Sequence, residues 1–227
     1  MKFEKLPQHI AIIPDGNRRW AKTKMLPVFL GHKEGYKRIE ELIDEVKDTG
    51  IKYLTVWAFS TENWKRDTEE KSQLFNLMAL GLDTLRDNIL IKKSRFVHLG
   101  RKDRLGKEIL DRINALEEAT KNYNDFTLCL AIDYGGEDEL LRAGDEYKKS
   151  ETEGVTLYHF LDTAKHGLPQ LDLIIRTSGE KRTSGFMPLQ SAYSEWYFSE
   201  KHFPDFGIEE LHNALKDYET RERRHGK

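Results

Sequence analysis

Short apolar runs alternate with longer amphipathic segments along this chain, and the alternation limits the folds open to it. Apolar runs rich in β-branched residues are typical of buried strands. In segment 35–49, Ile39, Leu42 and Val46 recur at helical spacing, and Gly50 follows as a stop signal. The alternation predicts βαβ units, and therefore an α/β fold with a mainly parallel sheet flanked by helices. The expected strands are 9–13, 53–59, 95–99, 127–132, 171–176 and 195–198, and the expected helices are 35–49, 68–88, 104–122, 138–149 and 157–164.

The length favours one domain over two small ones. No internal repeat or Pro/Gly-rich linker divides the 227 residues, so we expect a single domain over residues 1–227. Lys and Arg number 37 against 39 Asp and Glu. This balance predicts no nucleic-acid partner, and an anion site must therefore be built from local arginines.

The cysteine content and the hydropathy pattern bear on location. Cys129 lies in an apolar run and is expected to be a core thiol rather than half of a disulfide. Nothing at the N-terminus resembles a signal peptide, and no apolar stretch approaches the ~20 residues that span a bilayer. We expect a soluble, cytoplasmic protein.

Polar residues follow three of the expected strands. Residues 15–17 follow the first strand, residues 60–63 the second and residues 176–179 the fifth. In an open α/β sheet, the loops at the carboxyl ends of the strands line the ligand crevice. The three loops therefore predict one site at one edge of the sheet.

The first of these loops places Asp15 before a turn of free amides, with Arg18 and Arg19 opening a helix. Such a loop suits a phosphorylated ligand with a divalent metal. An Asx turn with an ordinary helix cap is the alternative interpretation.

The loop after the fifth strand carries Arg176 and Arg182, with hydroxyls and glycines between and beyond them. Arginine binds phosphate as a bidentate fork, and hydroxyl groups can complete the shell. A polar surface loop would show the same composition.

The loop after the second strand could be explained by N-capping through Ser60 or Thr61. Capping alone does not require Asn63, Trp64 and Arg66 together, and an amide beside a cation could position a substrate.

His32 follows a glycine and is expected just before the first long helix, where the helix N-terminus would let it share an anion. A structural or solvated histidine is the alternative.

Metal chemistry in this chain has to use carboxylates. One cysteine, scattered histidines and no HExxH exclude the common zinc arrangements, which leaves Mg²⁺ on one or two carboxylates and phosphate oxygens. Glu195, which opens the last strand, is a possible partner of Asp15 on such a metal. The chain contains neither GxxxxGK[ST] nor GxGxxG, so ATP hydrolysis and dinucleotide chemistry are disfavoured.

Together these segments resemble the cis-prenyltransferases, the undecaprenyl or polyprenyl diphosphate synthase family. The resemblance covers nearly the whole chain: HIAIIPDGNRRWAK, GHKEG, YLTVWAFSTENWKR, DLIIRTSGEKRTSGF, QSAYSEWYF and a closing Arg-x-Gly-like element within residues 223–226. Pro14 and the paired arginines resemble archaeal or eukaryotic members more than bacterial ones. The chain lacks the DDxxD motif of the trans-prenyltransferases.

The resemblance implies a parallel sheet with a hydrophobic tunnel, a homodimer, and Mg²⁺ as cofactor. The implied reaction condenses isopentenyl diphosphate with an allylic diphosphate, such as farnesyl or geranylgeranyl diphosphate, to a cis-polyprenyl diphosphate. Such a product would be the precursor of a lipid glycosyl carrier and could require peripheral membrane association. The alternatives are a short-chain cis-prenyl diphosphate synthase, a non-catalytic partner subunit and a phosphohydrolase.

The resemblance also implies roles for individual residues. Asp15 would bind Mg²⁺ and assist departure of the allylic diphosphate, Glu195 would be the second Mg²⁺ carboxylate, and Asn63 would be the proton acceptor or orient the proton transfer. The leaving diphosphate would be held by Gly16, Asn17, Arg18, Arg19 and His32, beside Trp20. Further substrate contacts would come from Ser60, Thr61, Glu62, Trp64 and Arg66. Isopentenyl diphosphate would be bound by Arg176, Arg182, Thr183 and Ser184, and Arg224-His225-Gly226 would reach that site across the dimer interface.

The chain departs from the family pattern at three positions. Val28 stands where many members have an arginine, which removes one presumed phosphate contact. Asp133 and Glu137 replace the polar ends of an Asn-Tyr-Gly-Gly-Arg segment. The expected helix 68–88 could form a tunnel wall, although its apolar residues suit an ordinary core helix equally well.

Overall fold

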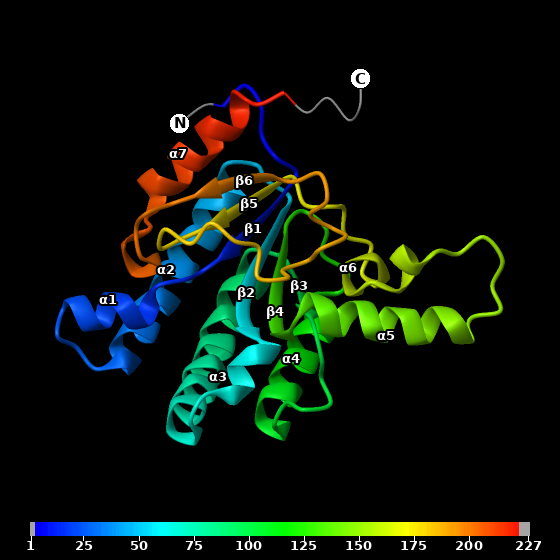
Figure 1. Cartoon of the computed structure of the whole chain (residues 1–227), viewed down its shortest axis with the longest axis horizontal. Helices are drawn as coiled ribbons and strands as arrows, with labels where there is room; N and C mark the ends of the chain where they lie inside the picture. Colours follow the sequence, from blue (N-terminus) through cyan, green and yellow to red (C-terminus); the bar gives the residue numbers. More distant parts are fainter. Residues whose placement is uncertain (1–2, 223–227) are drawn as a thin grey trace.

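A sheet of six parallel strands runs through the centre of the computed structural model, which describes residues 3–222 (Figure 1). The strand order is β3-β4-β2-β1-β5-β6, and every neighbouring pair is parallel. The α/β fold predicted from the alternating pattern is therefore confirmed. The strands are β1 (His9–Ile13), β2 (Tyr53–Ser60), β3 (Arg95–Leu99), β4 (Thr127–Tyr134), β5 (Leu173–Arg176) and β6 (Glu195–Phe198).

Helices connect the strands and cover the sheet. The α-helices are α1 (Asn17–Thr23), α2 (Val28–Asp48), α3 (Thr68–Ile91), α4 (Lys107–Thr120), α5 (Gly136–Lys149), α6 (Asp162–Lys165) and α7 (Ile208–Glu219), and the 3₁₀ helices are η1 (Thr61–Lys65), η2 (Leu157–Phe160) and η3 (Phe203–Asp205).

Three helices differ from the expectation. The segment 157–164 is not one helix, because extended Leu161 (ψ 147°) separates η2 from α6. Helix α7 had not been expected. Helix α2 begins seven residues earlier than expected and includes Gly31 and Gly35. A Cβ at either glycine would overlap Asn17, so these glycines allow α1 and α2 to approach closely.

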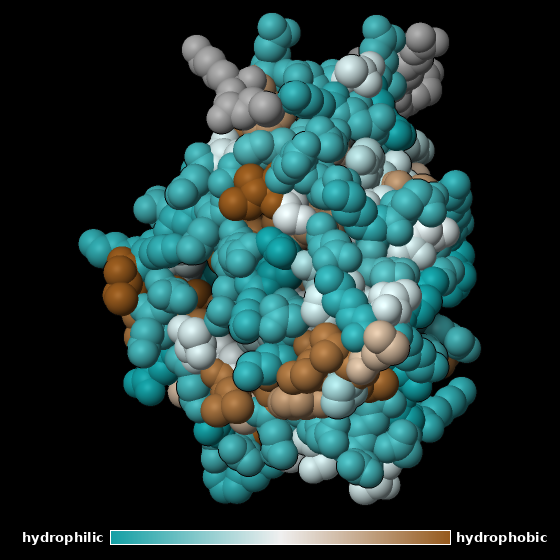
Figure 2. All heavy atoms as spheres, turned by 90° about the vertical axis from the view of Figure 1, so that its left-hand side faces the viewer, coloured by the Kyte–Doolittle hydropathy of each residue, from teal (hydrophilic) through white to brown (hydrophobic). Residues whose placement is uncertain are grey.

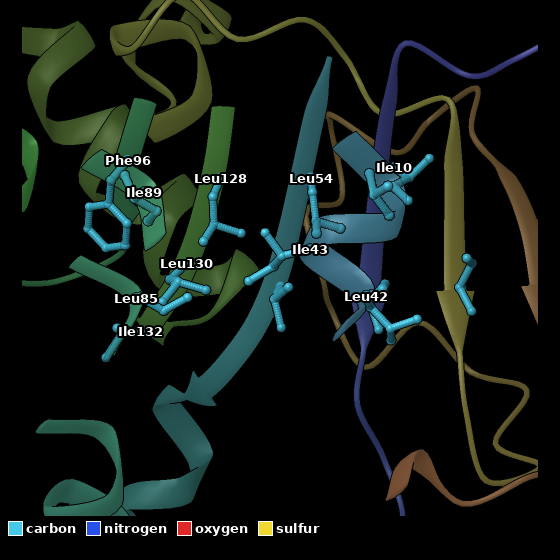
Figure 3. Packing of buried hydrophobic residues seen from close by; sticks show 14 of the residues in the cluster. Ile10, Leu42, Ile43, Leu54, Leu85, Ile89, Phe96, Leu128, Leu130 and Ile132 are labelled. Atoms are coloured by element: carbon cyan, nitrogen blue, oxygen red, sulfur yellow. The ribbon is translucent and has the colours of Figure 1, made fainter. Parts of the chain in front are cut away.

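Strands β1 and β4 are buried on both faces, which explains their nearly continuous apolar sequences. Ile10 and Ile12 of β1 pack in the cluster that includes α2, α3, α4 and α7, whereas Ala11 and Ile13 face the opposite cluster. In Figure 3, side chains of α2 and α3 lie beside those of β1, β2 and β4. Each fully buried Leu or Ile contributes roughly 1.5–3 kcal/mol, so this layer anchors both helices on the sheet.

One face of the molecule is mainly polar. Figure 2, which shows the left-hand side of Figure 1, has hydrophobic side chains only in a few separate patches on a largely hydrophilic face. Among residues 3–222, no helix combines the length and the apolar character needed to cross a bilayer. Cys129 is free and fully buried, as expected, and burial raises the pKa of its thiol to about 12.

Candidate active site

The carboxyl ends of β2, β1 and β5 lie side by side, and a cavity of about 360 Å³ opens there. Its walls include Asp15 from the loop after β1, Asn63 and Arg66 from the segment after β2, and Arg176 and Ser184 from β5 and its loop. The predicted convergence of the three loops at one sheet edge is confirmed. A second cavity of about 320 Å³ shares Asp15, Arg66 and other walls with the first and extends along α1.

Asp15 is held by a buried arginine. Nε and Nη2 of Arg176 lie 2.8 and 2.7 Å from Oδ2 of Asp15, and the Arg176 side chain is 4% exposed against 35% for Asp15. The Thr177 hydroxyl donates to the Asp15 carbonyl at 2.7 Å, and Nη1 of Arg176 donates to the Ser184 hydroxyl at 2.9 Å. Because both Asp15 contacts use Oδ2, the carboxylate is fixed while Oδ1 is left outside the Arg176 fork.

The turn between β1 and α1 requires glycine. Gly16 has φ +103°, and a Cβ there would lie 2.5 Å from Oγ of Ser178 and 2.9 Å from Nδ1 of His202. Those two side chains hydrogen-bond to each other at 2.6 Å. The backbone of the first loop therefore lies directly against the loop after β5, which brings Asp15 to Arg176.

Glu70 joins three basic side chains at the cavity. Its Oε1 lies 3.1 Å from Arg66 Nη1, 3.8 Å from Arg18 Nε and 3.7 Å from His32 Nε2, and the carboxylate is 12% exposed. Sequence reasoning missed Glu70. The available signal was Asp67, the N-cap of α3, which accepts from the Glu70 N–H at 2.7 Å with the three-residue spacing of a capping box.

His32 lies inside α2, in its second turn, and not before the helix as expected. Its Nε2 is buried without a hydrogen-bond partner among the described residues, and the side chain lines both cavities. Burial, together with the nearby Arg66 charge, lowers the His32 pKa to about 4. A neutral, unpartnered ring beside two arginines is the kind of group that an anionic ligand would complete.

Glu180, also missed from the sequence, joins the other two arginines. Its Oε1 lies 2.8 Å from Arg19 Nη1, and its second oxygen pairs with Arg182. Arg19 also donates to the Ser178 carbonyl at 3.3 Å. Both arginine side chains are about half exposed or more, so each pair with Glu180 contributes at most about 1 kcal/mol to stability. A phosphate could therefore replace Glu180 as their partner. Thr183 is exposed in the same loop.

The segment after β2 combines capping with cavity lining. Oδ1 of Asn63 accepts from the Ser60 N–H at 3.1 Å, so the capping interpretation holds, yet Ser60, Asn63 and Glu62 also line the cavity. The Thr61 hydroxyl donates to Glu62 at 3.0 Å. Asn63 therefore has a structural contact besides the role expected for it.

Two expected substrate contacts, Trp20 and Trp64, are not among the cavity walls. Trp20 is buried and its Nε1 donates to Asp205 at 2.8 Å. The Trp64 ring packs against Phe59 and Phe75, and its Nε1 donates to Asp133 at 2.7 Å. Within this chain both indoles hold elements together.

The three sequence departures have different surroundings. Asp133 is fully buried with φ +53°, and its Oδ2 accepts from Nε of Arg104 at 2.8 Å. This carboxylate therefore carries a charge pair and the Trp64 hydrogen bond at once. Glu137 is exposed, and Val28 is the first residue of α2.

The structure does not bring Glu195 to Asp15. Glu195 pairs in register with Leu173, which pairs with Ile10, so it lies near the amino end of the sheet. Asp15 lies two residues beyond Ile13, the last residue of β1. The offset is about five residues, or roughly 16 Å along a strand. Oε2 of Glu195 lies 2.8 Å from Arg221. Among residues 3–222, no group of three His, Cys, Asp or Glu side chains could hold a metal, and Arg224-His225-Gly226 falls outside the described residues.

Comparison with known proteins agrees with the resemblance. A family model described as "Putative undecaprenyl diphosphate synthase" matches residues 13–226. An isoprenyl transferase of Aquifex pyrophilus is 42% identical over 226 residues, covering 98% of this chain and 97% of the relative. One of Fusobacterium nucleatum is 42% identical over 221 residues, covering 97% and 96%.

Solved structures are similar over the same extent. Lavandulyl diphosphate synthase from Lavandula x intermedia, in complex with dimethylallyl diphosphate, has a TM-score of 0.91 at 31% identity and covers 98% of this chain and 99% of that one. A probable undecaprenyl diphosphate synthase from Campylobacter jejuni has a TM-score of 0.82 at 32% identity, with 99% and 100% covered.

The expected likeness to archaeal members finds no support, because the sequence relatives named above are bacterial. Membership of the family itself is confirmed by a family match over residues 13–226. The chain belongs to the undecaprenyl diphosphate synthase family of isoprenyl transferases.

Proposed function

We propose that the cavity at the carboxyl ends of β1, β2 and β5 binds an allylic diphosphate beside isopentenyl diphosphate and joins them with cis geometry. One observation carries this proposal: Asp15 is fixed by buried Arg176 at the point where the arginine-bearing loops meet. The bond from carbon to the allylic diphosphate breaks, the new carbon–carbon bond forms to isopentenyl diphosphate, and one proton and diphosphate leave.

The leaving diphosphate would lie against Arg18, Arg66 and His32. Cleavage of the carbon–oxygen bond places negative charge on the diphosphate oxygens, and fixed cations stabilise that charge as it develops. Glu70 holds these three side chains near one point, and they line the cavity that extends along α1. Gly16, Asn17 and Arg19, which line the same cavity, would complete the diphosphate site.

Isopentenyl diphosphate would lie against Arg176, Arg182 and Ser184, with Thr183 in the same loop. Arg176 already donates to Ser184, so a guanidinium and a hydroxyl face one place. Asn63 would orient the departing proton toward diphosphate, since an amide is too weak a base to take it alone. Ser60, Thr61 and Glu62 would position the substrates, and Trp20 and Trp64 would keep the surrounding loops in place.

Mg²⁺ fits the residues present. Magnesium is commonly held by one or two carboxylates together with substrate phosphates and water, and Asp15 offers one oxygen outside the Arg176 fork. When bound, the ion would neutralise charge on the leaving diphosphate. Within one chain Glu195 is too far along the sheet to join it, so a role for Glu195 on the metal would require a second copy.

The family resemblance supports a homodimer as the working form, with residues 224–226 of one copy reaching the isopentenyl site of the other. It also supports one catalytic domain over residues 1–227, a cytoplasmic location and peripheral contact with membrane for release of a long product. A polyprenyl diphosphate used as a lipid glycosyl carrier precursor is the proposed product class. A short-chain product is the second candidate, favoured by the likeness to lavandulyl diphosphate synthase.

The test is incorporation of radiolabelled isopentenyl diphosphate with dimethylallyl, geranyl, farnesyl and geranylgeranyl diphosphates, with Mg²⁺ or with EDTA. We expect incorporation that requires Mg²⁺ and falls at least 100-fold in Asp15→Ala while the far-UV circular dichroism stays unchanged. Asp145→Ala, an exposed carboxylate on α5 outside the cavity, is the matched control. No incorporation with any primer would refute the transferase proposal.

A further inference from the structure

Helices α2 and α3 both contribute to two separate cavities, one at the active site and one further along the helices. His32 of α2 and Leu74 of α3 form the cavity wall nearest the two helices. Further along both helices, Ile43 and Leu85 line a separate cavity of only about 10 Å³. An apolar tail extending from the active site along these helices would therefore follow one path, from the first cavity toward the second.

Tyr36 lies on α2 between the residues that line these two cavities. It follows His32 by four residues and precedes Glu40, a wall of the far cavity, by four, so it stands one helical turn from each. The phenol is largely buried, and burial raises its pKa well above the usual range.

Gly81 of α3 receives the Tyr36 ring. A Cβ on Gly81 would overlap three atoms of that ring, Cε1, Cζ and the hydroxyl oxygen. Gly81 is buried and its φ is not positive, so the backbone itself does not require glycine there. The missing side chain is explained by the space that the tyrosine occupies.

We infer that Tyr36, seated on Gly81, closes the path between α2 and α3 and thereby limits the length of the prenyl chain that the enzyme makes. This inference rests on the proposed function. Further along the two helices, Ile43 and Leu82 pack in the main core cluster. Removal of the ring would therefore open room for one or two more isoprene units and not for an unlimited chain.

The experiment compares the lengths of products formed from labelled isopentenyl diphosphate and farnesyl diphosphate. Tyr36→Ala should lengthen the main product by one or two isoprene units, and Tyr36→Leu should lengthen it less. Tyr36→Phe keeps the ring and should match the wild type. Leu80→Ala, on α3 next to Gly81 but 66% exposed, is the control that should leave the lengths unchanged.

Thermal unfolding tests the contact without any assay of activity. Gly81→Ala alone should lower the melting temperature by several degrees, because its methyl group meets the ring. In the Tyr36→Ala background the same change should be nearly neutral. Gly144→Ala, where a Cβ meets nothing within 4 Å, is the matched control.

The outcomes separate this inference from the function beneath it. If wild-type protein incorporates no isopentenyl diphosphate with any primer, the proposed function fails and this inference with it. If wild type is active and both Tyr36→Ala and Tyr36→Leu give wild-type lengths, the inference alone is overturned. Additive effects of Gly81→Ala and Tyr36→Ala on melting temperature would contradict the contact itself.

Discussion

Single residues at the cavity are held by partners of opposite charge. Arg176 holds Asp15, Glu70 gathers Arg18 and Arg66, and each contact involves a side chain that is mostly buried or half-buried. Pre-oriented charges of this kind need little rearrangement when a charged ligand binds or when charge moves in a reaction. His32 differs from them, because its buried Nε2 has no partner among the described residues.

His32 should therefore report anion binding directly. Its pKa is about 4 in the free protein because it is buried and close to Arg66. A diphosphate beside the ring would favour the charged imidazolium, so inorganic pyrophosphate should raise the His32 pKa by at least one unit. Histidine NMR titration measures this shift. His98, also buried on β3 with a pKa of about 4 but outside both cavities, should not respond. Equal shifts at the two histidines would contradict a diphosphate site at His32.

At the scale of elements, the strands were more predictable than the loops. Strands buried on both faces have continuous apolar sequences, so β1 and β3 match their predicted bounds. The half-buried strand β6 also matches its predicted bounds. The start of α2 was missed because glycine favours loops in sequence patterns, while Gly31 and Gly35 serve close packing against α1. Acidic residues such as Glu70 and Glu180 have no local pattern that reveals which arginines they will meet.

The β1–α1 turn offers a test of its geometry. Gly16→Ala introduces a left-handed residue and a clash with Ser178, whereas Gly50→Ala introduces a left-handed residue into open space. The backbone cost in each is about 1–2 kcal/mol, and the clash should add about 1–3 kcal/mol to the first. Urea denaturation compares the two free energies of unfolding. Equal losses would show that the first loop is not packed tightly against the loop after β5.

The contact between η1 and the loop before α4 depends on buried Asp133. Asn tolerates the positive φ of this residue and can still accept from Trp64, so Asp133→Asn removes mainly the charge that pairs with Arg104. Since Arg104 is partly exposed, we expect a loss of about 1–3 kcal/mol in the free energy of unfolding. Asp103→Asn, which breaks an exposed pair with Arg101, should cost under about 0.5 kcal/mol. A neutral Asp133→Asn would refute a stabilising role for the pair.

At the scale of the whole molecule, three buried histidines predict how stability depends on pH. Burial lowers the pKa values of His9, His32 and His98 to about 4, from a usual 6.5. Between pH 4 and pH 6.5 the unfolded chain binds more protons than the folded one. The contribution of the neutral histidines to the free energy of unfolding is therefore fully present above pH 6.5 and is lost as the pH drops toward 4. Each histidine can contribute on the order of 2–3 kcal/mol.

Urea denaturation at pH 7.0 and at pH 4.5 checks this expectation. His98→Gln, which removes one of the three groups, should make the fall in stability between the two pH values smaller. A stability that is constant or rises as the pH falls would contradict the assignment of neutral buried histidines.

The fold places the arginine-bearing loops and Asp15 at one sheet edge, where the proposed condensation would occur. The most direct measurement is the geometry of the newly formed double bond, read by NMR of the product made from ¹³C-labelled isopentenyl diphosphate and farnesyl diphosphate. The account predicts a cis (Z) bond in every added unit. A trans bond, or a product without a new carbon–carbon bond, would contradict it.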